Sequence, residues 1–459
     1  MATGVLSRAT RLSPYAIVVI CGAQLMATLD VTIVNLALPA MQPELGLTNA
    51  GLAWVIDAYT LAYAGLLLVG GRTGDLIGHR RTLMIGISIF TLSSLVGGLA
   101  QDAGWLLAER AGQGIGAALA TPTTLSLITT LYPAGAVRTR AMVAYGAMAG
   151  LGITLGLVLG GVLTEAASWR WVFLVNVPIG AALLVSAPRL LPESRGVRRR
   201  LDVLGALVGT AALTSLVYGV IRAGTHGWGD PASTGALVAA AVLIGAFVVV
   251  ELRSKEPMLP LHLLRHRTRL GAYLVAGLLF ACLYPSFFFL SRAAQDVQGL
   301  APIEAGVRFL PIGVGVLLFA IVTRRLVATV APRVLVVGGT VATALAALSL
   351  TLLQPSTSYA ALLLPSLIGL GAGVGTTFVA NAAAAMTDVD ERDAGIGSGV
   401  LSTFQAVGGT VGVAVLASMA AAETAATGSL LAGFHHGFLI ASALAALAAL
   451  VAAFAATRR

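Results

Sequence analysis

Four charged residues lie within long apolar runs, where a charge is costly. Asp30 is near the middle of the run that contains TLDVTIVNLALP (28–39), Asp57 lies in WVIDAYTLAY, and Glu109 and Arg110 are adjacent in a third run. A charged side chain at the centre of a bilayer costs on the order of 3 kcal/mol on the insertion scale. Charges kept at such depth are expected to be functional and to have a partner.

We consider these four residues candidates for binding and moving protons. Glu109 points about 100° away from Arg110 on a helix, so Arg110 is expected to pair with Asp30 or Asp57 instead. Desolvation favours the neutral acid and a nearby arginine favours the carboxylate, and their balance would let Asp30 exchange a proton near neutral pH. The alternative is a static ion pair that joins helices. For Asp57 both interpretations stay open, and Glu109 is expected to be exposed at the mouth.

The same run carries a second polar face. On a helix Asp30 shares a side with apolar residues, whereas Gln24, Thr28 and Asn35 form a separate polar stripe. Two interior-facing sides are expected of a helix that lines a cavity. The candidate cavity residues are Gln24, Thr28, Asn35, Tyr59, Gln113 and Phe287. The run YPSFFFL (284–290), which contains Phe287, could line an apolar site, but an aromatic belt at the membrane interface is the preferred interpretation.

The composition predicts an integral membrane protein. Hydrophobic residues make up 58% of the 459 residues and charged residues 10%, against about 25% charged in soluble domains. The formal charge of +9 comes from short basic clusters between apolar runs, which argues against nucleic acid as a partner. Cys21 and Cys282 both lie in apolar runs, which disfavours a disulfide scaffold or a metal site. No nucleotide-binding loop, metal cluster or hydrolytic triad is visible, so no cofactor, ATP-driven pumping or enzymatic activity is expected.

A spanning helix needs roughly 20 apolar residues, and this criterion predicts an all-α bundle. The fourteen candidate spans are about 15–40, 50–70, 80–100, 104–130, 141–164, 170–188, 202–222, 233–250, 270–291, 303–323, 333–353, 358–384, 395–419 and 433–456. The first run is too long for a signal peptide and is taken as the first span.

The positive charges predict the orientation. With the N-terminus in the cytoplasm, all but five of the 28 Lys and Arg residues fall at cytoplasmic ends. The exceptions are Arg110, Arg170, Arg222, Arg292 and Arg308. Both termini are therefore expected in the cytoplasm.

The chain divides into two six-helix halves around an insertion. The basic loops 189–202 and 251–269 flank a predicted hairpin at about 202–250. The expected units are a bundle at 1–188, the loops and hairpin at 189–269, and a second bundle at 270–459. GIGAALATP (114–122) resembles GVGTTFVAN (373–381), which places Gly150 opposite Gly409. Two parallel repeats are typical of transporters.

Two glycine-containing segments are candidates for a conformational switch. In GRTGDLIGHRR (71–81), Gly71 and Gly78 are expected to form a tight turn, Asp75 to cap a helix or pair with an arginine, and Arg80 and Arg81 to lie at the membrane surface. Such a loop could latch one face of the protein or simply fix its topology. In the fifth span the stacked glycines predict a smooth groove for close helix packing. They are Gly152, Gly156, Gly160 and the neighbouring Gly161.

These motifs, in this order, resemble the major facilitator superfamily, in its fourteen-helix drug:proton antiporter branch. The resemblance covers nearly the whole chain and includes LDVTIVNLALP (29–39), GRTGDLIGHRR, RAGQGIGA (110–117), GLVLGG (156–161), LAPIEAGVRFLP (300–311) and AGIGSGVLSTFQAVGGTVGVAV (394–415). Leu157 stands where this branch usually has proline, and Leu76 where arginine is common.

The resemblance implies export of amphipathic drugs, such as lipophilic cations, driven by a proton gradient across the bacterial cytoplasmic membrane. Asp30 would carry the proton with Arg110 assisting, Asp75 and its glycines would control the switch, and the fifth-span glycines would seal the interface between the halves. A monomer is expected. Export of an endogenous metabolite, proton symport and passive facilitation remain alternatives.

Overall fold

The computed structural model describes residues 15–133, 136–193, 202–254, 262–327, 329–387 and 394–455, and these residues form helices and connections with no β-strand. The first helices are α1 (Ala16–Glu44), α2 (Asn49–Ile77), α3 (His79–Gly97), α4 (Ala103–Leu131), α5 (Ala136–Ala166), α6 (Trp171–Leu174) and α7 (Asn176–Leu190). Next come α8 (Val203–His226) and α9 (Pro231–Arg253). The last are α10 (His262–Arg265), α11 (Arg267–Arg292), α12 (Pro302–Leu326), α13 (Pro332–Ser349), α14 (Leu364–Ala385), α15 (Ala394–Thr427) and α16 (Leu430–Ala455). The short turns η1 (Ala293–Val297), η2 (Leu350–Leu352) and η3 (Tyr359–Leu363) extend α11 and α13 and precede α14.

Side-chain caps fix where several helices begin. Asp102 accepts a hydrogen bond from the Trp105 backbone N–H at 2.8 Å at the start of α4, and Thr48 caps α2 in the same way. Asp230 caps α9 by accepting a hydrogen bond from the Ser233 N–H. The pKa of the Asp230 carboxyl lies below its usual range, mainly because the Arg222 guanidinium donates to it and next because the Ser233 N–H does. These caps satisfy backbone donors that the first turn of a helix leaves open.

Twelve helical segments in the described part of the chain are long and apolar enough to cross a membrane. All twelve correspond to spans predicted from the sequence, and α6 and α7 together make up one of them. Helix α2 contributes only a shorter apolar stretch, Trp54–Leu67, and α3 is not among the twelve. The total of fourteen spans therefore stays a prediction.

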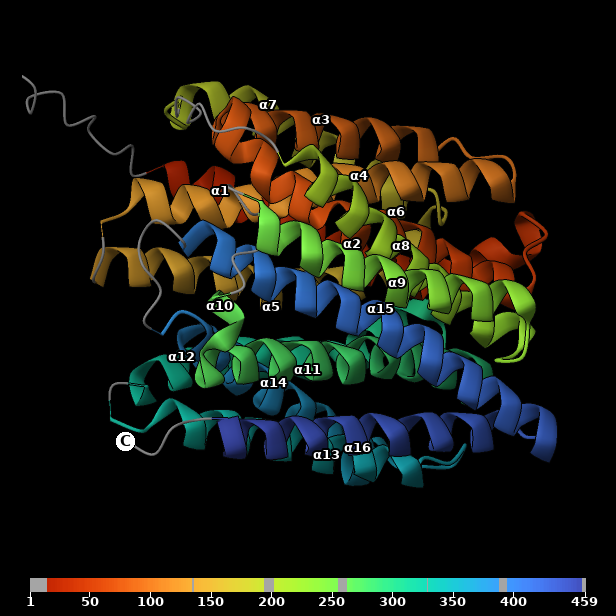
Figure 1. The fold of residues 1–459 in the computed structure, drawn as a ribbon. Helices are drawn as coiled ribbons and strands as arrows, with labels where there is room; N and C mark the ends of the chain where they lie inside the picture. The colour runs from red at the N-terminus through yellow and green to blue at the C-terminus, as the bar shows by residue number, and fades with distance from the viewer. Residues whose placement is uncertain are drawn as a thin grey trace, which may run out of the picture.

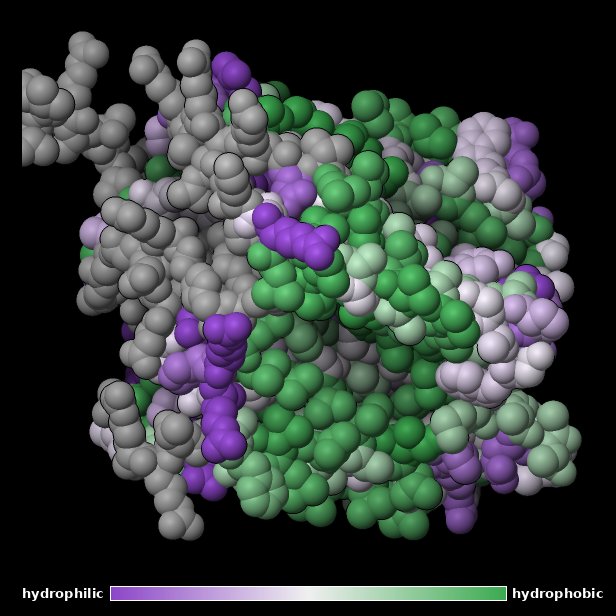
Figure 2. Space-filling model, in the orientation of Figure 1, coloured by the Kyte–Doolittle hydropathy of each residue, from purple (hydrophilic) through white to green (hydrophobic). Residues whose placement is uncertain are grey.

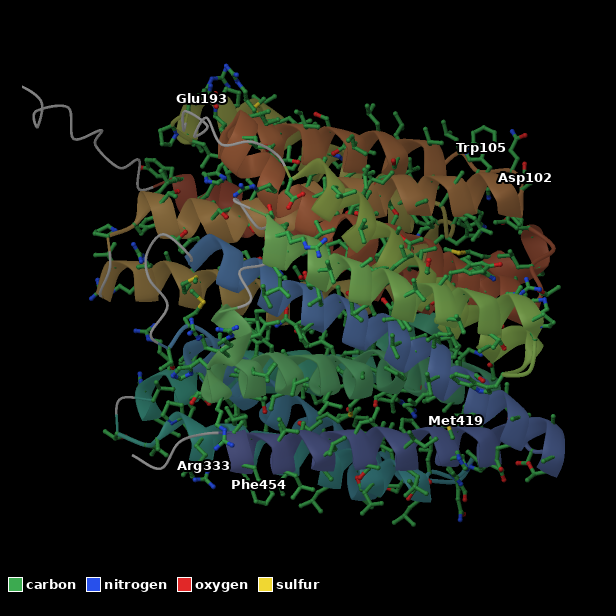
Figure 3. The ribbon with its side chains drawn as sticks, viewed as in Figure 1. Asp102, Trp105, Glu193, Arg333, Met419 and Phe454 are labelled. Carbon is green, nitrogen blue, oxygen red and sulfur yellow. The ribbon has the colours of Figure 1, made fainter. Side chains whose placement is uncertain are left out.

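The surface has the layered polarity of a multi-pass membrane protein. Figure 2 shows a hydrophobic band across the middle of the visible face, with hydrophilic side chains gathered at both ends. Figure 3 places Glu193 and Arg333 at one end and Asp102 at the other. We call the first the arginine-rich end and the second the Asp102 end. Of the predicted basic loop 189–202, residues 194–201 lie outside the described part of the chain. Of the loop 251–269, residues 255–261 lie outside it, and the rest forms the end of α9, the short helix α10 and the start of α11.

The helices before α8 and after α10 pack in corresponding ways. Helix α4 packs against α2 and α3, as α14 packs against α12 and α13, and α1 packs on α5 as α11 packs on α15. Figure 1 shows α1–α7 toward the top of the view and α11–α14 and α16 toward the bottom, with α8 and α9 on the near side and α15 running obliquely across the middle. Helix α8 contacts both α2 and α15, so it bridges the two groups.

The contacts place the repeat in a different register from the predicted one. The prediction aligned Gly114 with Gly373, but a Cβ atom on Gly114 would meet α2, whereas one on Gly373 would meet Gly339 and Thr343 of α13. Helix α3 is the counterpart of α13 in the first group, and it is Gly116 that faces α3, where its added Cβ would meet Gly86. The predicted match was therefore wrong by two residues, because glycines that recur every two residues fit either register.

The stacked glycines of α5 contact α1 of the same group. A Cβ on Gly152 would lie 2.7 Å from the Thr28 side chain, one on Gly156 would overlap Thr32, and one on Gly160 would lie 2.9 Å from the Ile33 carbonyl oxygen. The resemblance placed these glycines, with the buried Gly161, between the two halves, and the observed contacts correct this. Helix α12 is instead approached by Gly150 and Thr154, and the two groups meet there.

We expect Gly156→Val to push α5 away from α1 and to reduce thermal stability by several degrees. The added atoms must displace Thr32 or the Leu29 carbonyl, and overpacking costs about 1–3 kcal/mol. Gly245→Val in α9 is the matched control, because nothing lies within 4 Å of its added Cβ. Thermal unfolding in detergent measures both variants, and equal midpoints would contradict the prediction.

Candidate functional site

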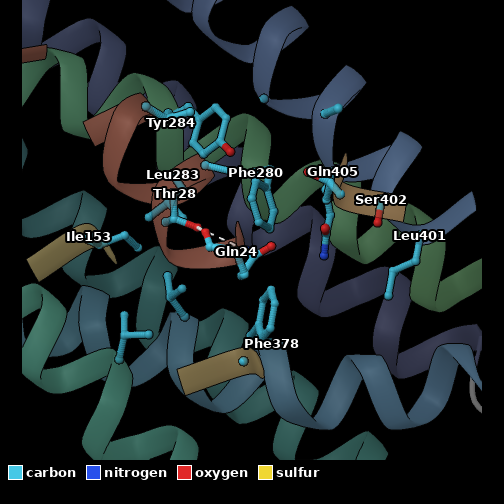
Figure 4. Close-up of a pocket in the computed structure, with 18 of the residues that line it drawn as sticks. Gln24, Thr28, Ile153, Phe280, Leu283, Tyr284, Phe378, Leu401, Ser402 and Gln405 are labelled. Atoms are coloured by element: carbon cyan, nitrogen blue, oxygen red, sulfur yellow. Dashed lines mark hydrogen bonds between the residues drawn. The ribbon is translucent and has the colours of Figure 1, made fainter. Parts of the chain in front are cut away.

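A cavity of about 510 Å³ lies between the two groups of helices. Its walls come from α1, α2, α4 and α5 on one side and from α11, α12, α14 and α15 on the other. Figure 4 shows Gln24 and Thr28 projecting toward the ring of Phe280, with Phe378 and Gln405 on adjoining walls. The cavity thus has the size of a small-molecule site.

The two walls differ in chemistry. The α1 wall carries the predicted polar stripe of Gln24, Thr28 and Asn35, and Gln24 donates a hydrogen bond to Thr28 at 3.1 Å. Tyr59 and Asp57 of α2 extend this polar side. The opposite wall is mainly apolar and carries most of the rings, which are Phe280, Tyr284, Phe287 and Phe288 from α11 and Phe378 from α14. Its polar groups include Ser402 and Gln405 of α15. A bound molecule would meet a polar stripe on one side and a largely apolar, ring-bearing surface on the other.

The aromatic run in α11 is not an interfacial belt. Phe287 and Phe288 line the cavity, and Phe289 is buried against Phe434 and Phe438, with ring centroids 5.8 and 5.7 Å apart. The preferred interpretation of YPSFFFL as an interfacial belt was therefore wrong. The run lies at an apolar cavity wall, as the alternative requires, and its contact with a substrate stays a prediction. The sequence could not decide, because aromatic residues are enriched in both settings.

The cavity extends to the arginine-rich end. Val327 and Met386, the C-caps of α12 and α14, line it there together with Arg138 and Arg324. Toward the Asp102 end the groups are in contact. Leu36 and Ile153 belong to one buried cluster with Phe287 and other residues of the second group. Ser291 of α11 also donates to the Asn35 carbonyl oxygen at 3.3 Å, which adds a polar contact between the groups on that side.

Asp30 forms the centre of a buried polar network beside the cavity. Its Oδ2 accepts from Arg110 Nη1 at 2.7 Å, and its Oδ1 accepts from Gln113 Nε2 at 3.0 Å and from Asn176 Nδ2 at 2.9 Å. All four side chains are buried, and Asp30 itself is not in the cavity wall. Of the two partners predicted for Arg110, the structure thus shows Asp30.

Arg110 is held in place by further contacts. Its Nε donates to the Val55 carbonyl oxygen at 2.9 Å, its Nη1 also donates to Gln113 Oε1, and its guanidinium lies 4.6 Å from the centre of the Tyr59 ring. Gln113 in turn donates to Ser94 at 2.7 Å. Because Arg110 and Tyr59 also line the cavity, the network and the cavity share a wall.

One placement corrects the prediction for this network, and two residues were not predicted. Gln113 was assigned to the cavity, but it lies behind the wall and binds Asp30. Asp30, expected near the middle of its apolar run, is at the midpoint of α1. Asn176 and Ser94 were missed altogether. Asn176 begins α7 directly after the break at Val175, and an uncharged amide gives no signal in a hydropathy pattern.

Asp57 and Glu109 differ from Asp30 in their surroundings. Asp57 lines the cavity, and its Oδ1 has no hydrogen-bond partner among the described residues. Glu109 was expected at an exposed mouth, but it is only 4% exposed and, in the described part of the chain, both carboxylate oxygens lack a hydrogen-bond partner. Its burial arises because α4 packs closely on α3 at this level.

The predicted switch segment forms a helix end and polar contacts with the end of α7, within the first group. Helix α2 continues to Ile77, so Gly71 lies inside it and only Gly78, with φ of 101°, forms the turn. Arg80 donates to the carbonyl oxygens of Pro188 and Leu191 and pairs with Glu193 at 2.5 Å. Arg81 is 3.7 Å from Glu193 and mostly exposed. The Asp75 side chain lies outside what the structure describes.

We expect Glu193→Gln to lower the free energy of unfolding by less than about 1 kcal/mol. The reason is that ion pairs near the surface, such as Arg80–Glu193, contribute little to stability. Thermal unfolding in detergent, compared with the wild type at low and high salt, measures the effect. A loss of several degrees that persists at high salt would contradict this expectation.

Comparison with known proteins identifies the family. The model for the Major Facilitator Superfamily matches residues 20–413. The chain is 40% identical over 444 residues to puromycin resistance protein Pur8 of Streptomyces alboniger, covering 94% of this chain and 88% of the relative. It is 39% identical over 431 residues to cephamycin export protein CmcT of Amycolatopsis lactamdurans, covering 92% and 88%. It is 38% identical over 408 residues to the lincomycin resistance protein of Streptomyces lincolnensis, covering 86% and 82%.

Solved structures share the fold. A POT family transporter in complex with a thioalcohol-conjugated peptide superposes with a TM-score of 0.72 at 15% identity, covering 95% of this chain and 94% of that one. The human organic anion transporter MFSD10 gives 0.66 at 18% identity, covering 95% and 98%. Helices, cavity and relatives agree, and the chain belongs to the Major Facilitator Superfamily as a multi-pass membrane transporter whose relatives are antibiotic resistance and export proteins.

Proposed function

We propose that this protein exports amphipathic antibiotics or related drugs across the bacterial cytoplasmic membrane in exchange for protons. The observation that carries the proposal is the buried network of Asp30, Arg110, Gln113 and Asn176, which shares a wall with the cavity. A carboxylate at the midpoint of a spanning helix is costly, and a proton-coupled cycle gives it a use. The resistance and export relatives support drugs as the substrate.

The proposed topology has fourteen spans, with both termini in the cytoplasm and α8–α9 as an inserted hairpin between two six-helix bundles. The arginine-rich end is then cytoplasmic by the positive-inside rule. The cavity in this conformation would take up substrate from the cytoplasm, or from the inner leaflet, and would release it after the bundles rock. The transporter would work as a monomer, with the proton gradient as its energy source and no cofactor.

The proposed coupling uses the hydrogen bonds of Asp30. Three donors stabilise its carboxylate in this conformation, so the proton would already have left for the cytoplasm. In the opposite conformation, movement of α4 would withdraw Arg110 and a proton from outside would neutralise Asp30. Asp57, at the cavity wall, would accept a hydrogen bond from the substrate or form an ion pair with a cationic group on it.

The decisive experiment measures proton movement in proteoliposomes under an imposed pH gradient. Puromycin, lincomycin, a cephamycin, a lipophilic cation and a neutral antibiotic would be added in turn, with protein-free liposomes as the control. Substrate-triggered proton movement opposite to the drug supports antiport. Proton movement in the same direction as the substrate would mean symport, and downhill substrate flux without protons would mean a facilitator.

The aromatic wall makes a separate prediction. We expect Phe378→Ala to weaken binding of an aromatic substrate by about 2–13-fold, because such ring contacts contribute about 0.5–1.5 kcal/mol beyond buried area. Phe454→Ala is the control, since that ring is 84% exposed on the outer surface of α16. Equilibrium binding to purified protein measures both, and an equal effect in the two variants would contradict the assignment of the wall.

A further inference from the structure

Glu109 is a buried carboxyl group that the proposed cycle does not use. It is only 4% exposed, and among the described residues neither oxygen has a hydrogen-bond partner. Asp30, on α1 of the same bundle, accepts hydrogen bonds from three donors. A buried charge without donors is far less stable than a buried neutral acid. The surroundings of Glu109 therefore suit the protonated form.

The carboxyl group occupies a notch at the end of α3. A Cβ atom on Gly97, the last residue of α3, would lie 2.5 Å from the Glu109 carboxyl carbon and 2.7 and 2.8 Å from its oxygens. Only glycine leaves room for the carboxyl group there. The last carbonyl groups of a helix carry partial negative charge, which further disfavours a carboxylate at this place.

The neighbouring charges are few. Arg110 on α4 and Asp30 on α1 are the charged groups that act on Glu109, with opposite signs. Arg110 is engaged by Asp30, Gln113 and the Val55 carbonyl oxygen, so its charge is already balanced. The end of α3, residues 93–97 (SSLVG), presents no titratable side chain. Beyond it, Arg170 donates to the Ala100 carbonyl oxygen and pairs with Glu44.

The position of Glu109 links the surface to the Asp30 network. Asp102, the N-cap of α4, lies at the surface of the Asp102 end (Figure 3). Glu109 is seven residues further along α4, about 10 Å deeper at the helical rise, and it directly precedes Arg110. A proton that enters along α4 from the Asp102 end would reach Glu109 before Asp30.

We propose that Glu109 is a second proton-binding site, which keeps its proton while the cavity is open at the arginine-rich end and exchanges it when the Asp102 end opens. The step is proton exchange alone: one carboxylate oxygen takes up a proton to give the neutral acid and later releases it to water. The coupling role rests on the proposed antiport, whereas the protonated state in this conformation does not.

The first test is infrared difference spectroscopy of purified protein at neutral pH. The wild type minus Glu109→Gln difference should contain the carbonyl stretch of a protonated carboxylic acid, shifted in D₂O. Glutamine has the shape of the neutral acid, so the variant should fold and unfold at a temperature no lower than the wild type. Glu304→Gln, an exposed residue paired with Arg308, is the control and should show no such band. Absence of the band in the Glu109 difference would overturn the proposal.

The second test counts protons moved per substrate in proteoliposomes. Glu109→Gln should move fewer protons per substrate than the wild type and should show a weaker dependence of export on external pH. An unchanged ratio and pH profile would overturn the coupling role. If wild-type protein moves no protons but the infrared band is present, antiport fails while the protonated state of Glu109 stands.

Discussion

Replacing Asp30 by Asn should reduce uphill export to the level of protein-free liposomes, while substrate binding is retained. Asparagine keeps the shape of the side chain and can still accept from Gln113 or Asn176, but it cannot carry a proton. Asp30 is not in the cavity wall, so loss of export need not come from loss of binding.

The measurement compares drug accumulation under a pH gradient with equilibrium binding of the same drug. Glu304→Gln, which alters an exposed carboxylate near the start of α12, should behave as the wild type in both. Export by Asp30→Asn that stays uphill and pH-dependent would show that the proton is carried elsewhere.

The second large effect concerns the stability of the buried pair. Removing either partner leaves the other charge buried and unpaired, which typically costs about 3–5 kcal/mol. Asp30→Asn and Arg110→Gln should therefore each lower the thermal midpoint in detergent markedly. The double variant should recover most of the loss, since two neutral side chains can still hydrogen-bond in the same space.

A double-mutant cycle on thermal unfolding separates structure from coupling. We expect a large coupling energy between Asp30 and Arg110, and we expect the stable double variant to remain inactive in uphill export. The exposed pair Glu304–Arg308 is the matched control, with a coupling of about 0–1 kcal/mol. If the double variant regained uphill export, the Asp30–Arg110 pair would have a structural role only and no role in proton coupling.

Much of the site could be predicted because charges in apolar runs are conspicuous. The depth of Arg110 required a partner, and the two faces of the first span followed from helical periodicity. Gln113 lies three residues after Arg110, so the same periodicity placed it on the Arg110 face, and that signal could have assigned it to the network rather than to the cavity.

The remaining residues carry no such signal. Ser94 and Asn176 are ordinary polar side chains whose importance depends on which helices meet, and that is decided by packing. The exposure of Glu109 was misjudged for the same reason: its distance from the helix end was known, but the notch at Gly97 was not. Glycine patterns predicted close packing of α5, yet they could not say which helix would fill the groove.

The two unlike walls of the cavity have a consequence for blocking this protein. In the proposed cycle one wall would move with α1 and α2 and the other with α11 and α14, so rocking would change the distance between them. A rigid molecule that hydrogen-bonds to Gln24 and Asn35 while its rings stack on Phe280 and Phe378 would hold the walls at one separation. Such a compound would act as an inhibitor wedged between the bundles, and cells that rely on this transporter would regain sensitivity to the antibiotic it removes.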